Sequence, residues 1–397
     1  MRVHHVAKCL VLLAAAALSA SCETSKVVGN NIVNLSRGGK FDGSEFSGAF
    51  AHDTEKLKAQ MEAAFASLRS NVQKRWGQGD TKTADSTTYV KYTQGYKSRV
   101  VTDFNQGMLT IETLDQADPQ ASLRTAIVAA LLTSDDPGAV DLFSDKEVTI
   151  EASRRPYLYG LVHDEHGKSV GTRAQAEKLA QYLVAKKLQT RTVTGDHGAL
   201  TARFVMVPMV KDFEDKSAQR YRASIEKYSA KWNVSPTLVL AIMRTESNFN
   251  PFAVSAAPAY GLMQLVPSSG GRDAYKRVTG IDEAPTPEYL YDPEHSIELG
   301  AAYLGQLSSS DFKAVGNLDS RDLCVIAAYN TGAGNVTKTF DKTPKIALAD
   351  INKLDSQALY ERLRTGLPYP ETRQYVVKVT SYRKQFASVA APITASR

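Results

Sequence analysis

Cysteine is scarce in this sequence and forms no cluster with histidine. Three cysteines and seven histidines occur in 397 residues, and they are not spaced like the ligands of a metal ion. Cys324 lies in the apolar run Leu323–Ala327, which is typical of a buried core position and not of a nucleophile. We therefore predict no metal site and no cofactor.

The sequence also lacks an obvious cluster of basic residues interleaved with aromatic ones, which argues against nucleic acid as a partner. The chain carries 48 Lys and Arg against 42 Asp and Glu, a net charge of +6. The net charge becomes +4 if Arg2 and Lys8 are removed with an N-terminal signal. A mild positive charge suits a polymer that bears carboxylates, but it is also ordinary for a soluble protein.

The apolar run Cys9–Ala20 is shorter than the roughly 20 residues that a membrane-spanning helix needs. It follows basic residues and ends at Ser21 and Cys22, which is the layout of a secretory signal. We predict a signal peptide over residues 1–21 and a lipid on Cys22. Cys324 is then the single free cysteine of the mature chain, which must fold without an intramolecular disulfide.

Ser19 stands where lipoprotein signals prefer leucine. The alternative is therefore ordinary export with cleavage near Ala20 or Ser21. Glu23 follows Cys22, whereas an aspartate there would be typical of retention in the inner membrane of Gram-negative bacteria. We therefore expect a lipoprotein of the outer membrane that faces the periplasm.

The remainder of the chain divides into three parts by composition and periodicity. Residues 22–50 are rich in Gly, Ser and Asn and are predicted to be a tether. Residues 51–212 open with a helical stripe over Asp53–Trp76 and continue with strand patterns and two helices, so we predict an accessory α+β domain with an antiparallel sheet. Residues 213–397 are almost wholly helical in pattern, which predicts a second, all-α domain.

The individual elements follow from the same patterns. The expected strands are Thr88–Thr93, Ser98–Phe104, Met108–Leu114, Val148–Ala152, Leu158–His163 and Ala202–Val207. The expected helices are Ala121–Leu132, Ala174–Lys187, and segments near 216–230, 236–247, 295–307, 321–329 and 371–387.

Glu246 is a carboxylate on a helix face that is otherwise apolar. Ser235 followed by proline is typical of a helix start, and Val239, Ile242 and Met243 mark one face of that helix. The next position on this face is Glu246. Burial and the nearby end of the helix both disfavour a charged carboxylate, which would keep it protonated as a general acid. The alternative is a solvated or salt-bridged surface residue.

Four short motifs occur in order along the second half of the chain. They are ESNFNPFAVS from Glu246, GLMQLVP from Gly261, AYNTGAG from Ala328 and ETRQYV from Glu371. Together they are similar to the soluble-lytic-transglycosylase family, whose lysozyme-like domain cleaves the glycan strands of peptidoglycan. The resemblance covers roughly residues 220–390.

The resemblance implies a function for each matching residue. Glu246 would act as acid and then as base, cleaving the MurNAc-GlcNAc β-1,4 bond without water. The C6 hydroxyl of the muramic acid would attack, which leaves a 1,6-anhydro-MurNAc end. No second protein carboxylate is needed if the N-acetyl group of the sugar stabilises the cation. The residues implied to bind the substrate are Ser255, Met263, Gln264, Tyr329, Asn330 and Tyr375.

Earlier segments, among them Thr110–Thr113 and Arg154–Gly160, resemble a membrane-bound branch of the same family. Two other functions stay open, a lysozyme-like muramidase that uses water and a non-catalytic scaffold that binds peptidoglycan. Tyr260 stands where many relatives carry a small residue, and it either narrows a subsite or faces away from the site.

Overall fold

The computed structural model describes residues 59, 62–150, 154–196, 198–255 and 259–390. The predicted signal peptide, the predicted lipidation site Cys22 and the whole predicted tether over residues 22–50 lie outside the described residues. The residues from Leu68 onward form one compact unit. Among the described helices, none combines the length and the apolar character needed to cross a bilayer.

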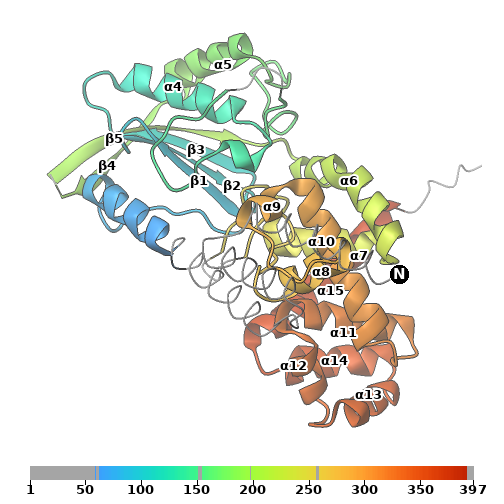
Figure 1. Ribbon diagram of the computed structural model, residues 1–397. Coiled ribbons are helices and arrows are strands. Elements are labelled where there is room, and N and C mark those ends of the chain that lie inside the picture. The colour runs from blue at the N-terminus through green and yellow to red at the C-terminus, as the bar shows by residue number, and fades with distance from the viewer. Residues whose placement is uncertain (1–58, 60–61, 151–153, 197, 256–258, 391–397) are drawn as a thin grey trace, which may run out of the picture. The chain divides into compact units, whose positions relative to one another are not determined.

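An antiparallel sheet of five strands, in the order β1-β2-β3-β5-β4, lies in the first part of this unit (Figure 1). Two helices, α4 and α5, lie along one face of the sheet. We call residues 68–212 the sheet region. Its strands and helices are β1 (Thr88–Thr93), β2 (Ser98–Asp103), β3 (Met108–Thr113), α4 (Pro119–Leu132), the short η1 (Pro137–Ala139), α5 (Arg173–Lys186), β4 (Gln189–Gly195) and β5 (Gly198–Pro208).

Side chains along the strands alternate between the two faces, as the pleat requires. On one face, Tyr89, Leu109 and Val205 join the buried core that α4 and α5 cover. On the other face, Val90 and Tyr92 pack with Trp76, at the end of a helix that precedes the sheet. The sheet is therefore the middle layer of three.

A buried ionic network lies on the Trp76 face of the sheet. Arg99 of β2 and Glu112 of β3 are opposite each other in the register, and their Nη2 and Oε2 atoms are 2.6 Å apart. Arg191 of β4 donates from Nε to the other oxygen of Glu112 at 2.9 Å and also reaches Asp80. The Arg99 guanidinium lies 3.8 Å from the centre of the Trp76 ring. These pairings fix the register, because buried charges are tolerated only when they are partnered.

The second part of the unit is helical, and we call residues 213–390 the helical region. Its helices are α6 (Phe213–Trp232), α7 (Pro236–Ser247), α8 (Gly270–Thr279), α9 (Pro287–Tyr291), α10 (Pro293–Gln306), η2 (Leu307–Asp311), α11 (Leu318–Thr331), α12 (Ala333–Lys338), α13 (Pro344–Asn352), α14 (Ser356–Gly366) and α15 (Pro370–Ala390). Helix α15 packs against α7, α11 and α14, and α10 packs against α6 and α8. The α+β fold class with a following all-α region is thus confirmed.

Two of the predicted strands are wrong. Residues 148–150 form no strand, and Leu158–His163 forms successive turns. In these turns the Tyr159 N–H donates to the Pro156 carbonyl, and the Leu161 N–H donates to the Leu158 carbonyl. The apolar side chains enter the core from turns, so their sequence pattern resembled that of a strand.

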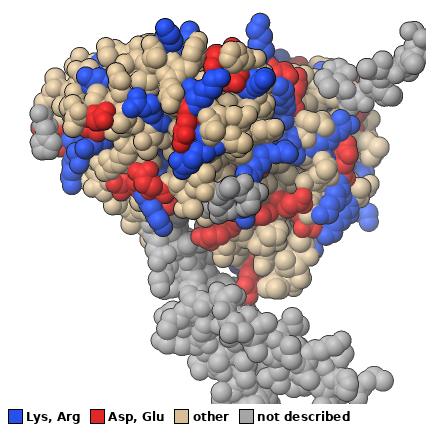
Figure 2. All heavy atoms as spheres, turned by 90° about the horizontal axis from the view of Figure 1, so that it is seen from above, with Lys and Arg blue, Asp and Glu red and all other residues tan. Residues whose placement is uncertain are grey.

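Charge is mixed on the face of the molecule seen in Figure 2, where Lys and Arg alternate with Asp and Glu. Among the described residues, opposite charges also pair along single helices, such as Arg173 with Glu177 of α5 and Arg222 with Glu226 of α6. A ligand approaching this face therefore meets both signs of charge and no single-sign field.

Candidate active site

Glu246 lies in the last turn of α7, where the sequence predicted an acid on an apolar face. Val239, Ile242 and Met243 are fully buried, and Glu246 is half-buried at the end of the same stripe. Ser235 occupies the N-cap position, but its hydroxyl hydrogen-bonds to that of Thr237 instead of capping the helix. Apolar packing, more than a cap, therefore fixes where the glutamate side chain emerges.

Glu246 lines a hollow of about 490 Å³. Four of the residues predicted to bind substrate line the same hollow: Ser255, Gln264, Tyr329 and Asn330. Ser255 and Gln264 lie in the loop that follows α7, the helix of Glu246, and Tyr329 and Asn330 lie in α11, so two segments distant in sequence meet here.

Tyr375 reaches the carboxylate from α15. Its hydroxyl donates a hydrogen bond of 2.6 Å to Oε1 of Glu246. The surrounding protein atoms raise the pKa of Glu246 from 4.5 to about 7, because the charged form loses hydration. The Tyr375 hydrogen bond lowers this pKa, and the negative charge of Glu371 raises it. A large share of Glu246 is thus protonated at neutral pH.

Tyr329 is held by a main-chain contact next to the glutamate. Its hydroxyl donates a hydrogen bond of 2.8 Å to the carbonyl oxygen of Met263. The Met263 side chain itself is fully buried toward Gly300 of α10 and does not line the hollow. The neighbouring Asn330 accepts a hydrogen bond of 2.6 Å from the hydroxyl of Thr372.

A tight turn presents Gln264 to the hollow. Gly261 has φ of +72°, and Gln264 itself has φ of +46°. The Gln264 amide donates from Nε2 to the Gly261 carbonyl at 2.9 Å, which closes the turn on itself. The Ser247 hydroxyl donates to the Leu262 carbonyl at 2.8 Å and so ties this turn to the end of α7.

Several residues that line the hollow were not predicted as site residues, among them Ser86, Tyr303 and Glu371. Ser86 comes from the segment before β1, and no local sequence pattern indicates that this segment lies near Glu246 in the fold. Tyr303 of α10 lies with its ring centre 5.5 Å from that of Tyr329. Glu371 opens the ETRQYV motif, so the motif itself was the signal for a second carboxylate.

Tyr260 faces away from the hollow. It is 1% exposed, and its ring meets that of Tyr291 edge to face with centres 5.6 Å apart. The alternative in which Tyr260 narrows a subsite therefore finds no support in its position. Cys324 is fully buried, and burial raises the pKa of its thiol to about 12, as suits a core residue.

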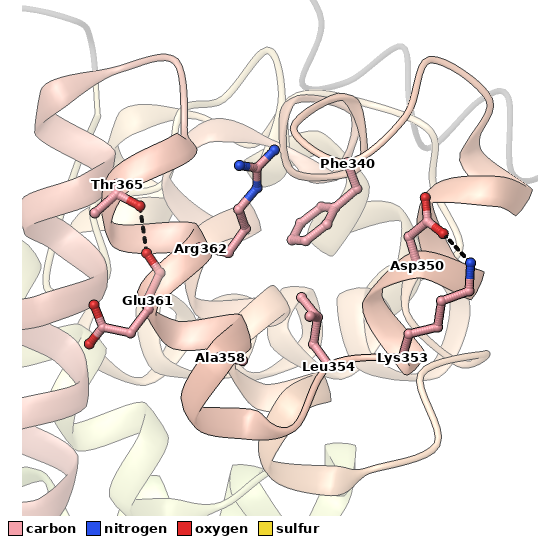
Figure 3. Close-up of a pocket in the computed structure, with 8 residues that line it drawn as sticks. All are labelled: Phe340, Asp350, Lys353, Leu354, Ala358, Glu361, Arg362 and Thr365. Carbon is pink, nitrogen blue, oxygen red and sulfur yellow. Dashed lines mark hydrogen bonds and ion pairs between the residues drawn. The ribbon is translucent and has the colours of Figure 1, made fainter.

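A second hollow, of about 570 Å³, lies among α13, α14 and the end of α12. Figure 3 shows Phe340 and Leu354 at its centre, with Arg362 beside them and the ion pair of Asp350 and Lys353 at one side. It contains none of the motif residues. Across the part of the chain that the structure describes, no group of three or more His, Cys, Asp or Glu could hold a metal ion.

Comparison with known proteins gives two matching family models. Residues 50–220 match the N-terminal domain of membrane-bound lytic murein transglycosylase C, and residues 223–351 match the transglycosylase SLT domain. Curated relatives named membrane-bound lytic murein transglycosylase C occur in Yersinia pestis (strain Pestoides F) and Yersinia pseudotuberculosis serotype O:1b. Each is 37% identical over 379 residues, covering 96% of this chain and 99% of the relative.

Two solved structures are also similar over part of the chain. A lytic transglycosylase Slt from Pseudomonas aeruginosa, an inactive mutant, is 30% identical with a TM-score of 0.35. The 70 kDa soluble lytic transglycosylase from Escherichia coli is 27% identical with a TM-score of 0.34. These matches cover 45% and 43% of this chain but only about a quarter of each solved chain. By its family models and its full-length relatives, the chain belongs to the membrane-bound lytic murein transglycosylase C family.

Proposed function

We propose that this enzyme cleaves the β-1,4 bond between MurNAc and GlcNAc of peptidoglycan without water. The product would be a 1,6-anhydro-MurNAc end. The single observation that carries the proposal is the state of Glu246, an acid with a pKa of about 7 at the wall of an open hollow. An acid of this strength can donate a proton at neutral pH and take one back in the next step.

The reaction needs two proton movements and one acid. Glu246 first donates its proton to the glycosidic oxygen, and the bond from that oxygen to C1 of MurNAc breaks. The N-acetyl group of the sugar stabilises the positive charge at C1. The Glu246 carboxylate then removes the proton of the C6 hydroxyl as O6 bonds to C1. Glu246 is protonated again at the end, and no water is consumed.

The remaining residues of the hollow would hold the sugar. Ser255, Gln264 and Asn330 offer hydroxyl and amide groups that match sugar hydroxyls and N-acetyl groups. The rings of Tyr329 and Tyr303 offer apolar faces at the same place. Tyr375 acts on the reaction through its hydrogen bond to Glu246.

The test of this assignment is Glu246→Gln in the purified chain, with isolated sacculi as substrate. The amide keeps the shape of the side chain and an acceptor for Tyr375, but it has no acidic proton to transfer to the glycosidic oxygen. We expect loss of cleavage by at least about a thousandfold, since the same group serves as acid and as base. Full activity of this variant would remove Glu246 from the mechanism.

A muramidase that uses water is the second candidate, and one observation favours it. Glu371 lines the same hollow and could activate water on behalf of a hydrolytic path. Mass analysis of the products separates the two paths, because the anhydro end is lighter than a reducing end by one water. We expect anhydro ends to dominate, and reducing ends alone would favour the muramidase.

We further propose that a lipid on Cys22 holds the enzyme at the outer membrane, facing the periplasm, with residues 22–50 as the tether. Replacement Cys22→Ser removes the acylated thiol. The variant is then expected in the soluble periplasmic fraction, and the unaltered chain in the membrane fraction. Retention of the variant in membranes would show that another segment anchors the protein.

A further inference from the structure

The loop that follows Glu246 leaves the helical region and enters the core of the sheet region. Phe252, six positions after the glutamate, is fully buried and belongs to the same core as α4 and α5. Its ring centre lies 4.4 Å from that of Tyr89 and 5.1 Å from that of Tyr157. Tyr89 is on β1, so the loop is anchored by aromatic contacts to the sheet.

Polar contacts also fasten the part of this loop that precedes Phe252 to the sheet region. Asn248 donates from Nδ2 to the Phe104 carbonyl at 2.6 Å, just after β2. Asn250 donates from Nδ2 to the Ser86 carbonyl at 3.2 Å. Asn250 also accepts the Phe252 N–H on Oδ1 at 3.0 Å, so one side chain joins the sheet region to the loop.

The backbone of this loop has an uncommon conformation. Asn248 and Phe249 have φ of +45° and +63°, two left-handed residues in succession without glycine. Such residues persist where the surroundings hold them. Here the hydrogen bond to the Phe104 carbonyl and the packing of Phe252 in the aromatic core stabilise this backbone conformation.

This loop carries two groups of the proposed active site at its ends. Glu246 precedes it on α7, and Ser255 ends it, and both line the hollow. We infer that Phe252 and Asn250 are positioning residues, through which the sheet region sets the geometry of Glu246 and Ser255 for catalysis. This inference rests on the proposed function. Phe252 and Asn250 do not line the hollow, so they would act on the chemical step through Glu246 and Ser255.

The test compares Phe252→Ala with Leu123→Ala in the full chain. Leu123 is fully buried in the same core but belongs to α4 and not to the loop, so its truncation weakens that core from another element. We expect both variants to melt at lower temperature than the unaltered chain. At a temperature where both are folded, kcat should fall about ten- to a hundredfold in Phe252→Ala and stay within about twofold in Leu123→Ala, because displacement by about 1 Å can cost a hundredfold.

Two further variants test the same inference if Phe252→Ala does not fold. Phe252→Leu retains an apolar plug and should recover most of kcat. Asn250→Asp has the same size and still accepts the Phe252 N–H, but it cannot donate to the Ser86 carbonyl. We expect a lowered kcat for Asn250→Asp with near-normal secondary structure by circular dichroism.

Equal kcat loss in Phe252→Ala and Leu123→Ala, or unchanged kcat in Phe252→Ala and Asn250→Asp, would overturn the inference. Either result leaves the proposed function intact as long as the unaltered chain cleaves sacculi and Glu246→Gln does not. An inactive unaltered chain, in contrast, is a failure of the proposed function itself.

Discussion

Burial and two neighbouring side chains set the pKa of Glu246, and they act in different directions. Burial raises the pKa most, the Tyr375 hydroxyl lowers it, and Glu371 raises it. Each contribution belongs to a separate side chain or to the packing around it. Single substitutions should therefore change the pKa of Glu246, and whether the pKa rises or falls depends on which neighbour is replaced.

Tyr375→Phe removes a hydrogen bond that favours the charged form of Glu246. The pKa of Glu246 should rise above about 7, so the decline of activity on the alkaline side should move to higher pH. The maximal rate should also fall roughly tenfold, because the carboxyl loses its orientation. The pH profile of glycan cleavage measures both effects, and a shift toward lower pH would contradict this explanation.

Glu371→Gln should change the pKa of Glu246 in the opposite direction to Tyr375→Phe. Loss of a nearby negative charge makes ionisation of Glu246 easier, so its pKa should fall. The alkaline decline of activity should then begin at lower pH than in the unaltered enzyme. An unmoved profile would indicate that Glu371 is too well solvated to affect Glu246.

Glu246→Gln should stabilise the fold in a pH-dependent way. The folded pKa of about 7 exceeds the reference of 4.5, so ionisation in the folded state costs stability as the pH rises from 4.5 to 7. The gain in the free energy of unfolding should be near zero at pH 4 and reach up to about 3 kcal/mol above pH 7. Denaturant titrations at pH 4 and pH 8 test this, and a gain at pH 4 alone would contradict it.

At the scale of elements, the turn Gly261–Gln264 meets the end of α9 without room for a side chain. A Cβ on Gly261 would collide with the carbonyl oxygen of Leu290, and φ of +72° is unfavourable for any other residue. We expect Gly261→Ala to cost about 2–4 kcal/mol of stability, since the backbone of Leu290 cannot move aside cheaply.

Gly334 is the matched control for this turn. It lies in α12, and a Cβ there would meet no atom within 4 Å. Gly334→Ala should be neutral or stabilising by up to about 1 kcal/mol, as expected for alanine in a helix. Urea denaturation of both variants is the measurement. Equal losses would show that the Leu290 contact does not decide the outcome.

The elements that could be predicted from sequence are those with a strong local signal. The strand Thr88–Thr93 and helices α4, α5, α7 and α15 follow from periodicity, proline and motif positions. The edge strand β4 was missed because QTRTVTG is mostly polar and only Val193 on it is fully buried. Helices α8 and α14 were missed because few of their residues are buried.

The site shows the same limit. Glu246, Ser255, Gln264, Tyr329 and Asn330 lie in motifs, so their grouping could be expected from a family resemblance. Ser86 and Tyr303 lie in no motif, and only the packing of distant segments brings them to the hollow. Met263 is the opposite case. It lies in a motif, but its side chain is fully buried and does not line the hollow.

At the scale of the whole molecule, the two regions share a core through Phe252. The sequence suggests domains 51–212 and 213–397, and this division stays a prediction. Residues from Leu68 onward form one compact unit, and the core of the sheet region includes a side chain from the helical region. Neither region can lose its fold without exposing that aromatic contact.

We therefore expect the described unit to unfold in a single cooperative transition. Calorimetry should give equal calorimetric and van't Hoff enthalpies for the full chain. Two separated transitions would show that the regions are energetically independent, despite the shared core.

The proposed cleavage depends most on one protonated carboxyl, that of Glu246, and the titration of this carboxyl is the most direct measurement. In a chain with carbon-13-labelled glutamate, the side-chain carboxyl signal absent from Glu246→Gln identifies Glu246. We predict a titration midpoint near 7 for this signal, as burial requires. A midpoint near the reference of 4.5 would contradict the account, because Glu246 would then have almost no proton to donate at neutral pH.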